Sequence, residues 1–341
     1  MAGQVRRAGV RQAVAAQPAQ RLLAKAALRR VIGPTLTQQE REALEVQRRK
    51  ELEEETVITP VPVDQDAMLA RVLPVLRGLA SKTGHKLLHV DRQPTVMEFV
   101  NSRDLGALAA LGTSCPDHFL RTKINPLVLS LAITEDISDS AAIREIIKPA
   151  FEQYRADYAE YYEACKRADS PAMRDANPVV IIYPGIGIFT FAKDKQTARV
   201  ASEFYQNAIN VMRGAEAISS YTALPRQEAF NIEYWLLEEA KLQRMPAEKP
   251  LSRRIALITG GGGGIGGAIA KKLAAEGAHI VITDLSEERL KEGIQYYNKD
   301  VARYFSADIT QENDLLKLID FTCFSLSEVL PKLFPLVFII L

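Results

Sequence analysis

Short apolar runs alternate along most of the chain with segments whose apolar residues recur at helical spacing. This alternation predicts an α/β fold. Runs with strand character, rich in Val, Ile and Leu, lie at 86–90, 127–133, 179–183 and 255–258, and a turn and second strand are predicted over 184–191. Helical periodicity marks 68–76, 95–100, 141–168, 195–218 and 227–244.

Five consecutive glycines, 260–264, separate the apolar run 255–258 from a segment in which Ile265, Ile269 and Leu273 form a predicted helical face. Strand, glycine turn and helix in this order are the context of a dinucleotide-binding fingerprint. The glycines let the backbone approach a pyrophosphate, and the helix N-terminus offers free N–H groups to it. A flexible glycine linker is the alternative. The predicted cofactor-binding residues of this turn are Gly260, Gly264, Ile265 and Gly266.

Acidic residues end the next two predicted strands. Asp284 closes the run 279–284 and follows Gly266 by 18 residues, near the spacing of about 20 for the acid that binds ribose hydroxyls. A carboxylate there repels a 2′-phosphate, which predicts NAD(H) rather than NADP(H). Asp308 ends a third run and is predicted as a further cofactor-binding residue. The C-terminal region is therefore expected to hold an incomplete Rossmann-type parallel sheet.

Proline-punctuated stretches at 57–63 and 245–250 suggest domain boundaries. We predict four parts: a basic tail, charged helix and linker over 1–66, an α/β domain over 67–250, a partial NAD-binding Rossmann domain over 251–320, and an apolar tail of doubtful origin over 321–341. The basic, acid-free stretch 1–39 fits either a disordered tail or a transit-like arm. The final tail is too short and too interrupted for a membrane helix. We expect it to result from a frame change or a premature end of the coding region, and the alternative is an apolar packing tail or weak membrane contact.

Composition narrows the class of protein. The net charge of +1 argues against a general nucleic-acid footprint. The 3 cysteines and 4 histidines show no metal-ligand or disulfide spacing, which suits a reducing cytosol and predicts no metal site. We therefore expect a cytoplasmic protein with a small-molecule substrate, no nucleic acid and no membrane; a homo-oligomer stays open.

The segment 112–123 concentrates reactive side chains in what we predict to be a polar loop. Cys115 and His118 suggest a nucleophile and base, or His118 a metal ligand, and Arg121 and Lys123 suggest a phosphate or sugar contact. The competing interpretation is that these side chains only cap neighbouring backbone.

Aromatic residues follow a helical stripe through 151–162, which is typical of core or interface packing. Tyr162 and Lys166 have the Tyr-x-x-x-Lys spacing of an acid/base pair in short-chain dehydrogenases. We reject that role because the pair precedes the glycine turn by almost a hundred residues.

Several segments together resemble one family. The glycine pattern of 259–266 is similar to that of short-chain dehydrogenases/reductases. The stretches 112–123, 184–195 and 208–246 resemble the bifunctional rhamnulose-1-phosphate aldolase/short-chain dehydrogenases, above all at 210–218 and 232–246. The resemblance covers roughly residues 70–320.

The resemblance implies an aldolase part that cleaves a ketose 1-phosphate with histidine-bound zinc, and a dehydrogenase part that oxidises lactaldehyde with NAD. It carries over to Gly260, Gly264, Ile265, Gly266, Asp284 and Asp308. The zinc histidines have no counterpart, because Pro184 or Gly185 stands where a ligand is expected. The catalytic Ser and the Tyr-x-x-x-Lys pair are also missing after the glycines, so we assign no catalytic and no metal residue.

The sequence thus indicates a fragment, truncated at both ends, of an NAD-dependent oxidoreductase fused to an aldolase-type region of L-rhamnose catabolism, without turnover as written. Whether the chain is an enzyme stays uncertain. The alternatives are a non-catalytic NAD(H)-binding module and a non-functional product of a broken gene.

Overall fold

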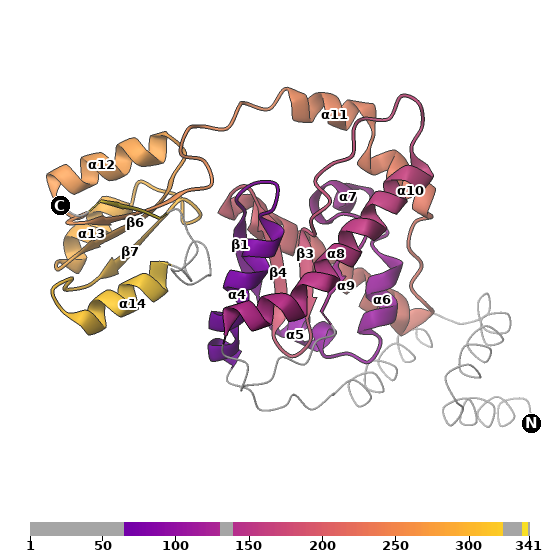
Figure 1. Ribbon diagram of the computed structural model, residues 1–341, viewed down its shortest axis with the longest axis horizontal. Coiled ribbons are helices and arrows are strands. Elements are labelled where there is room, and N and C mark those ends of the chain that lie inside the picture. The colour runs from indigo at the N-terminus through magenta and orange to yellow at the C-terminus, as the bar shows by residue number, and fades with distance from the viewer. Residues whose placement is uncertain (1–64, 130–138, 323–335, 340–341) are drawn as a thin grey trace, which may run out of the picture. The chain divides into compact units, whose positions relative to one another are not determined.

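The computed structural model describes residues 65–129, 139–322 and 336–339 (Figure 1). The chain has an α/β fold with two sheets, one formed by strands that precede residue 250 in the sequence and one by strands that follow it. The predicted tail, charged helix and linker of 1–66 fall outside the described residues except at their last two positions.

The first sheet has the strand order β1-β4-β3-β2. Its strands are β1 (Leu87–Asp91), β2 (Leu127–Val128), β3 (Val180–Tyr183) and β4 (Gly187–Ala192). β4 pairs antiparallel with both β1 and β3, whereas β2 pairs parallel with β3. The predicted strands at 86–90 and 179–183 and the turn and strand at 184–191 are confirmed. In the predicted strand 127–133, Leu127 and Val128 form β2, and residues 130–133 lie outside the described residues.

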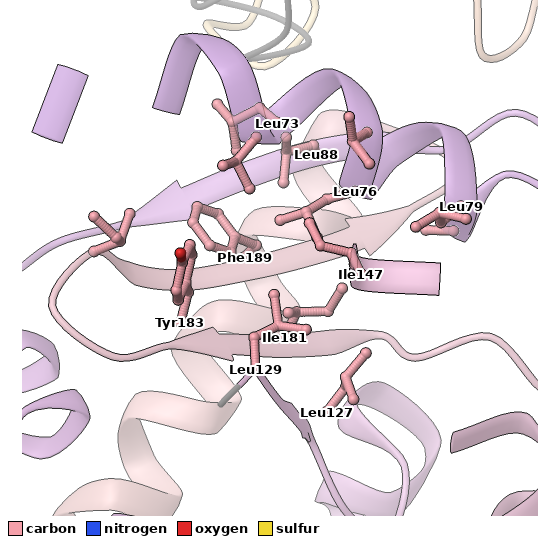
Figure 2. Close-up of a cluster of buried hydrophobic side chains, with 14 of the residues drawn as sticks. Leu73, Leu76, Leu79, Leu88, Leu127, Leu129, Ile147, Ile181, Tyr183 and Phe189 are labelled. Atoms are coloured by element: carbon pink, nitrogen blue, oxygen red, sulfur yellow. The ribbon is translucent and has the colours of Figure 1, made fainter. Parts of the chain in front are cut away.

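Helices α4 (Gln65–Ala80) and α8 (Ser140–Cys165) pack against this sheet and close the main core. Figure 2 shows Leu73 and Leu76 of α4 and Ile147 of α8 pointing toward Ile181 and Phe189 of the sheet. All five side chains are fully buried, and each such burial stabilises the fold by about 1.5–3 kcal/mol.

The predicted polar loop at 112–123 is wrong over most of its length. The short helix α7 (Pro116–Thr122) occupies most of this segment, and two further short helices precede it, α5 (Pro94–Val100) and α6 (Leu105–Leu111). Pro116 begins α7, where its fixed φ favours the first helical turn and its missing N–H is not needed. Gly112 has φ 78°, and a Cβ there would lie 2.4 Å from the Ile124 carbonyl oxygen.

The predicted helix at 195–218 is confirmed as α9 (Lys195–Ile218), but the one at 227–244 is two helices. α10 (Arg226–Glu233) ends at Tyr234, and α11 (Leu236–Gln243) begins after Trp235 in an extended conformation. No residue of α11 is buried, so the apolar spacing that suggested one long helix does not reflect one packed face.

The second sheet is parallel throughout and has the order β7-β6-β5-β8. Its strands are β5 (Ile255–Thr259), β6 (His279–Asp284), β7 (Ala302–Ser306) and β8 (Leu336–Ile339). Helices α12 (Gly264–Ala275), α13 (Glu287–Ile294) and α14 (Glu312–Thr322) complete the domain (Figure 1).

Both faces of this sheet are apolar, as expected for parallel strands. Ala256, Ile258 and Ile282 belong to a core with α12 and α13. Leu257 and Val281 alternate with them and share a core with Leu318 of α14.

The expectation of three strands is wrong. β8 comes from the apolar tail and pairs parallel with β5, with Ile255 opposite Leu336 and Ile258 opposite Ile339. Strand order therefore reverses between β5 and β8, and ligands of open α/β sheets bind at the carboxyl end of such a switch point.

Candidate cofactor-binding site

The turn after β5 adopts a conformation that requires glycine at two positions. Gly260 has φ 63°, in the left-handed region that side chains disfavour. A Cβ on Gly266 would lie 2.3 Å from the Gly260 carbonyl oxygen, so α12 starts in direct contact with the turn. A third glycine, Gly261, lies so close to β6 that a Cβ would be 2.5 Å from Cβ of Ile282.

The first turn of α12 is open to a ligand. Its N-cap residue is Gly263, which supplies no side-chain hydrogen bond. The first N–H groups of a helix have no partner within it, and a Cβ on Gly264 would meet no atom within 4 Å. These donors, together with the helix dipole, suit an anionic group such as a pyrophosphate.

Asp284 touches this glycine turn directly. Its Oδ2 accepts from the Gly262 N–H at 3.2 Å, and its Oδ1 accepts from the Ser286 N–H at 3.3 Å. The carboxylate is half-buried at the end of β6. Two backbone donors therefore fix the acid beside the glycines, where its oxygens can also accept from ribose hydroxyls.

Asp308 lies beyond the end of β7, and its hydrogen bonds are with residues that follow it closely in the chain. Its Oδ1 accepts from the Thr310 hydroxyl at 2.7 Å and from the Thr310 N–H at 3.0 Å. These bonds hold the pKa of the Asp308 carboxyl below its usual range. Just after β7, the Ala307 N–H donates to the Asp284 carbonyl of β6 at 3.2 Å.

The structure thus brings Gly260, Gly264, Gly266 and Asp284 together, and places Asp308 one strand further along the same edge. Ile265 is on the turn as well, but 73% of it is exposed, so it is not part of the packed face of α12. The predicted apolar face is wrong at this position, because the buried residues of α12 are Gly266 and Ala270.

Sequence reasoning missed two neighbours of the site. Ser286 caps α13 by accepting from the Arg289 N–H at 3.4 Å. Arg289 lies so close to the glycine turn that a Cβ on Gly262 would be 2.9 Å from its own Cβ. A serine after a strand-ending acid, followed by Glu287 and Glu288, is typical of a helix N-terminus and could have predicted the start of α13. The contact of Arg289 with the glycine turn could not have been predicted in this way.

The reactive residues of 112–123 do not form a site. His118 is 2% exposed, its Nε2 lies 3.4 Å from Asn207 Nδ2, and its ring packs edge-on against Phe204 at 5.3 Å. Burial lowers the His118 pKa, which favours the neutral ring. Within the described part of the chain, no contact joins this ring to the Cys115 thiol.

Lys123 is also unavailable to a phosphate, because only 7% of it is exposed. Its Nζ donates to the Asp175 carbonyl and lies 3.7 Å from the ring centroid of Tyr158. Loss of hydration lowers the Lys123 pKa to about 8. The interpretation as a phosphate contact is therefore wrong for Lys123, while Arg121 is exposed.

The aromatic stripe of α8 is confirmed as core. Tyr158 and Tyr161 donate to the two carboxylate oxygens of Glu233 at 2.6 and 3.2 Å. Glu233 is 1% exposed, and burial raises its pKa. Tyr162 is buried and donates to the Pro171 carbonyl, whereas Lys166 is an exposed partner of Glu163, in keeping with rejection of that pair.

Comparison with known proteins divides the chain at the same linker. Residues 67–242 match the second domain of class II aldolase, which is more than half of the chain. The chain belongs to the class II aldolase family. Residues 254–329 match the short chain dehydrogenase family, and this segment contains the glycine turn, Asp284 and Asp308.

One relative spans both parts of this aldolase-family chain. It is an uncharacterized oxidoreductase, YuxG, of Bacillus subtilis, 36% identical over 261 residues that make up 75% of the chain and 37% of the relative. The chain therefore spans little more than a third of that protein's length.

Other similar proteins match the dehydrogenase part alone. A γ-butyrolactone 1′-reductase of A-factor type from Streptomyces virginiae is 42% identical over 74 residues, covering 21% of the chain and 29% of that protein. The crystal structure of levodione reductase is 34% identical over 20% of the chain and 29% of its own, with a TM-score of 0.19.

No group of three or more His, Cys, Asp or Glu side chains gathers among the described residues in a way that could hold a metal ion. No helix in that part of the chain is long and apolar enough to cross a membrane.

Proposed function

We propose that the dehydrogenase-like domain binds NAD(H) at the β5 turn. The observation that carries the proposal is the hydrogen bond of the Gly262 N–H to Asp284 Oδ2 beside the open N-terminus of α12. This bond supports the proposal because a fixed acceptor suited to a ribose hydroxyl then lies next to donors suited to a pyrophosphate. Gly260, Gly264 and Gly266 would shape the pyrophosphate site, with Ile265 and Asp308 at its borders.

The same acid is the basis for proposing NAD(H) over NADP(H). A 2′-phosphate carries up to two negative charges, and at this position it would approach the Asp284 carboxylate. Like charges in close contact repel. NADP(H) also lacks the 2′-hydroxyl of NAD(H), which can donate a hydrogen bond to the carboxylate.

A bound nicotinamide supplies a hydride acceptor or donor. The other half of an alcohol oxidation is removal of the hydroxyl proton, for which a Tyr with a nearby Lys serves. No Tyr-x-x-x-Lys pattern follows the glycine turn in this chain. We therefore propose that the chain by itself binds the cofactor and does not turn over.

For the whole protein of which such domains are parts, we propose a cytoplasmic enzyme of L-rhamnose breakdown. The aldolase-type region would act on rhamnulose 1-phosphate, and the dehydrogenase region would oxidise lactaldehyde. This rests on the resemblance at 210–218 and 232–246 and on the relative that contains both parts. A non-catalytic NAD(H)-binding module and a product of a broken gene are the competing proposals.

The direct test is a thermal melt of the purified chain with NADH and with NADPH. A ligand at 100 times its Kd stabilises the domain by about 2.7 kcal/mol, so NADH should raise the Tm in a dose-dependent way and NADPH much less. Gly266→Ala serves as the control that loses the site. If neither nucleotide shifts the wild-type melt, the broken-gene proposal gains, and oxidation of lactaldehyde by this chain would refute the absence of turnover.

A further inference from the structure

The side chain of Arg289 begins next to the acid that is proposed to select the cofactor. A Cβ built on Gly262 would lie 2.9 Å from Cβ of Arg289 and 3.2 Å from Oδ2 of Asp284. Both side chains therefore border the same point of the glycine turn. This point faces the ribose if Asp284 binds the ribose hydroxyls.

The position of Arg289 is fixed by its helix. Its N–H donates to the Ser286 side chain at the N-cap of α13, and Ser286 donates its own N–H to Asp284. Acid, cap and arginine thus form one connected unit at the end of β6.

The guanidinium of Arg289 is exposed, and no hydrogen bond or ion pair involving it occurs among the described residues. The other cation of α13, Lys291, differs in this respect, because its Nζ pairs with Glu287 at 2.9 Å. Glu288 is the remaining charged group of the first turn and is exposed.

We propose that Arg289 is a second specificity-determining residue, which attracts a 2′-phosphate while Asp284 repels it. The proposal rests on the proposed NAD(H) site. It implies that the chain's preference is a balance of two opposite charges at one ribose, and that removing the acid alone converts the site to NADP(H). Guanidinium groups bind phosphate through paired N–H donors.

The test measures Kd for NADH and NADPH on the full chain by fluorescence titration, in wild type and in four variants. Asp284→Asn removes the charge and keeps an oxygen that can accept from Gly262. We expect it to tighten NADPH binding by about tenfold or more, since a phosphate contact adds to the loss of repulsion. Adding Arg289→Ala to Asp284→Asn should abolish most of that gain, and the difference between the two variants should shrink at high salt.

Arg289→Ala alone should leave NADH binding within about twofold of wild type, because a 2′-hydroxyl carries no charge. The matched control is Lys291→Ala with Asp284→Asn, which removes a cation two residues away that already has a partner. This pair should keep the gain for NADPH.

The outcomes distinguish failure of the proposed NAD(H) site from failure of the proposed role of Arg289. If wild type binds neither nucleotide, the proposed function fails. If wild type binds NADH but Asp284→Asn gains nothing for NADPH, or gains equally with and without Arg289, the role of Arg289 is overturned and the NAD(H) site stands.

Discussion

At the scale of single residues, Gly264 and Gly266 differ in how much room the glycine turn leaves for a side chain. Gly266→Ala puts a methyl group 2.3 Å from the Gly260 carbonyl oxygen, whereas Gly264→Ala puts one into open space. We expect Gly266→Ala to destabilise the second domain by about 1–3 kcal/mol and to abolish NADH binding. Gly264→Ala should keep the fold and bind NADH at least in part.

Thermal melts with an NADH titration compare these variants directly. Equal behaviour of the two would mean that the turn does not hold α12 against β5 as described. The sequence identified both positions as functional glycines, but only the contact distances show which one the packing requires.

A second residue-scale prediction concerns pH. The folded-state pKa of Lys123 is about 8, below its ordinary value of 10.5, because burial outweighs attraction by Glu233 and Asp175, while Lys86 and Arg174 lower it further. A base with a lowered pKa binds fewer protons when folded than when unfolded between these values, so its contribution to stability increases with pH there.

Lys123→Met removes this group while keeping a side chain of similar length. From pH 7.5 to 10, we expect the stability of wild type relative to Lys123→Met to increase by roughly 1–2 kcal/mol. Denaturant unfolding at several pH values measures it. A constant difference over this range would show that Lys123 titrates normally.

At the scale of elements, periodicity and propensity found most helices and strands because these segments each bury one continuous face. α9 matches its predicted bounds, and β3 and β4 follow the β-branched runs. The break between α10 and α11 was missed because no Gly or Pro marks it and the apolar spacing continues through Leu236 and Leu237, which are exposed.

Tertiary pairing explains the other element that was missed. Nothing in the local sequence shows that Leu336–Ile339 has a partner strand, since β5 lies about eighty residues earlier. The site was easier to predict, because glycines and a strand-ending acid occur at fixed spacings. Arg289 was missed because its role depends on how α13 packs against the turn.

β8 gives the element-scale prediction. It lies outside the segment that matches the dehydrogenase family, yet it forms the second side of the switch point. We expect deletion of residues 336–341 to weaken NADH binding by at least tenfold, since one β5 edge loses its hydrogen-bond partner.

Two proline variants refine that test. In a parallel pair, consecutive residues direct their N–H groups to opposite sides, and β8 has a single neighbour among the described strands. Of Val337→Pro and Phe338→Pro, one should therefore disrupt pairing with β5 and the other should be tolerated better. If both bind NADH like wild type, the strand is dispensable for the site.

At the scale of the whole molecule, each sheet has a large apolar cluster of its own, and a proline-containing linker connects the two parts of the chain. We expect calorimetry of the full chain to show two transitions, because each domain closes its own apolar layers. NADH should raise only the transition of the dehydrogenase-like domain, since a ligand stabilises the unit that binds it.

Variants assign the two transitions. Gly266→Ala should remove the response to NADH and leave the other transition in place. Glu233→Ala should lower only the aldolase-family transition, by about 1–3 kcal/mol, because the hydroxyls of Tyr158 and Tyr161 lose their buried acceptor; Glu228→Ala, at an exposed position of the same helix, should lower it little. A single transition that moves as a whole with NADH and with Glu233→Ala would show that the domains unfold as one cooperative unit, and the boundary at 250 would then have no thermodynamic meaning.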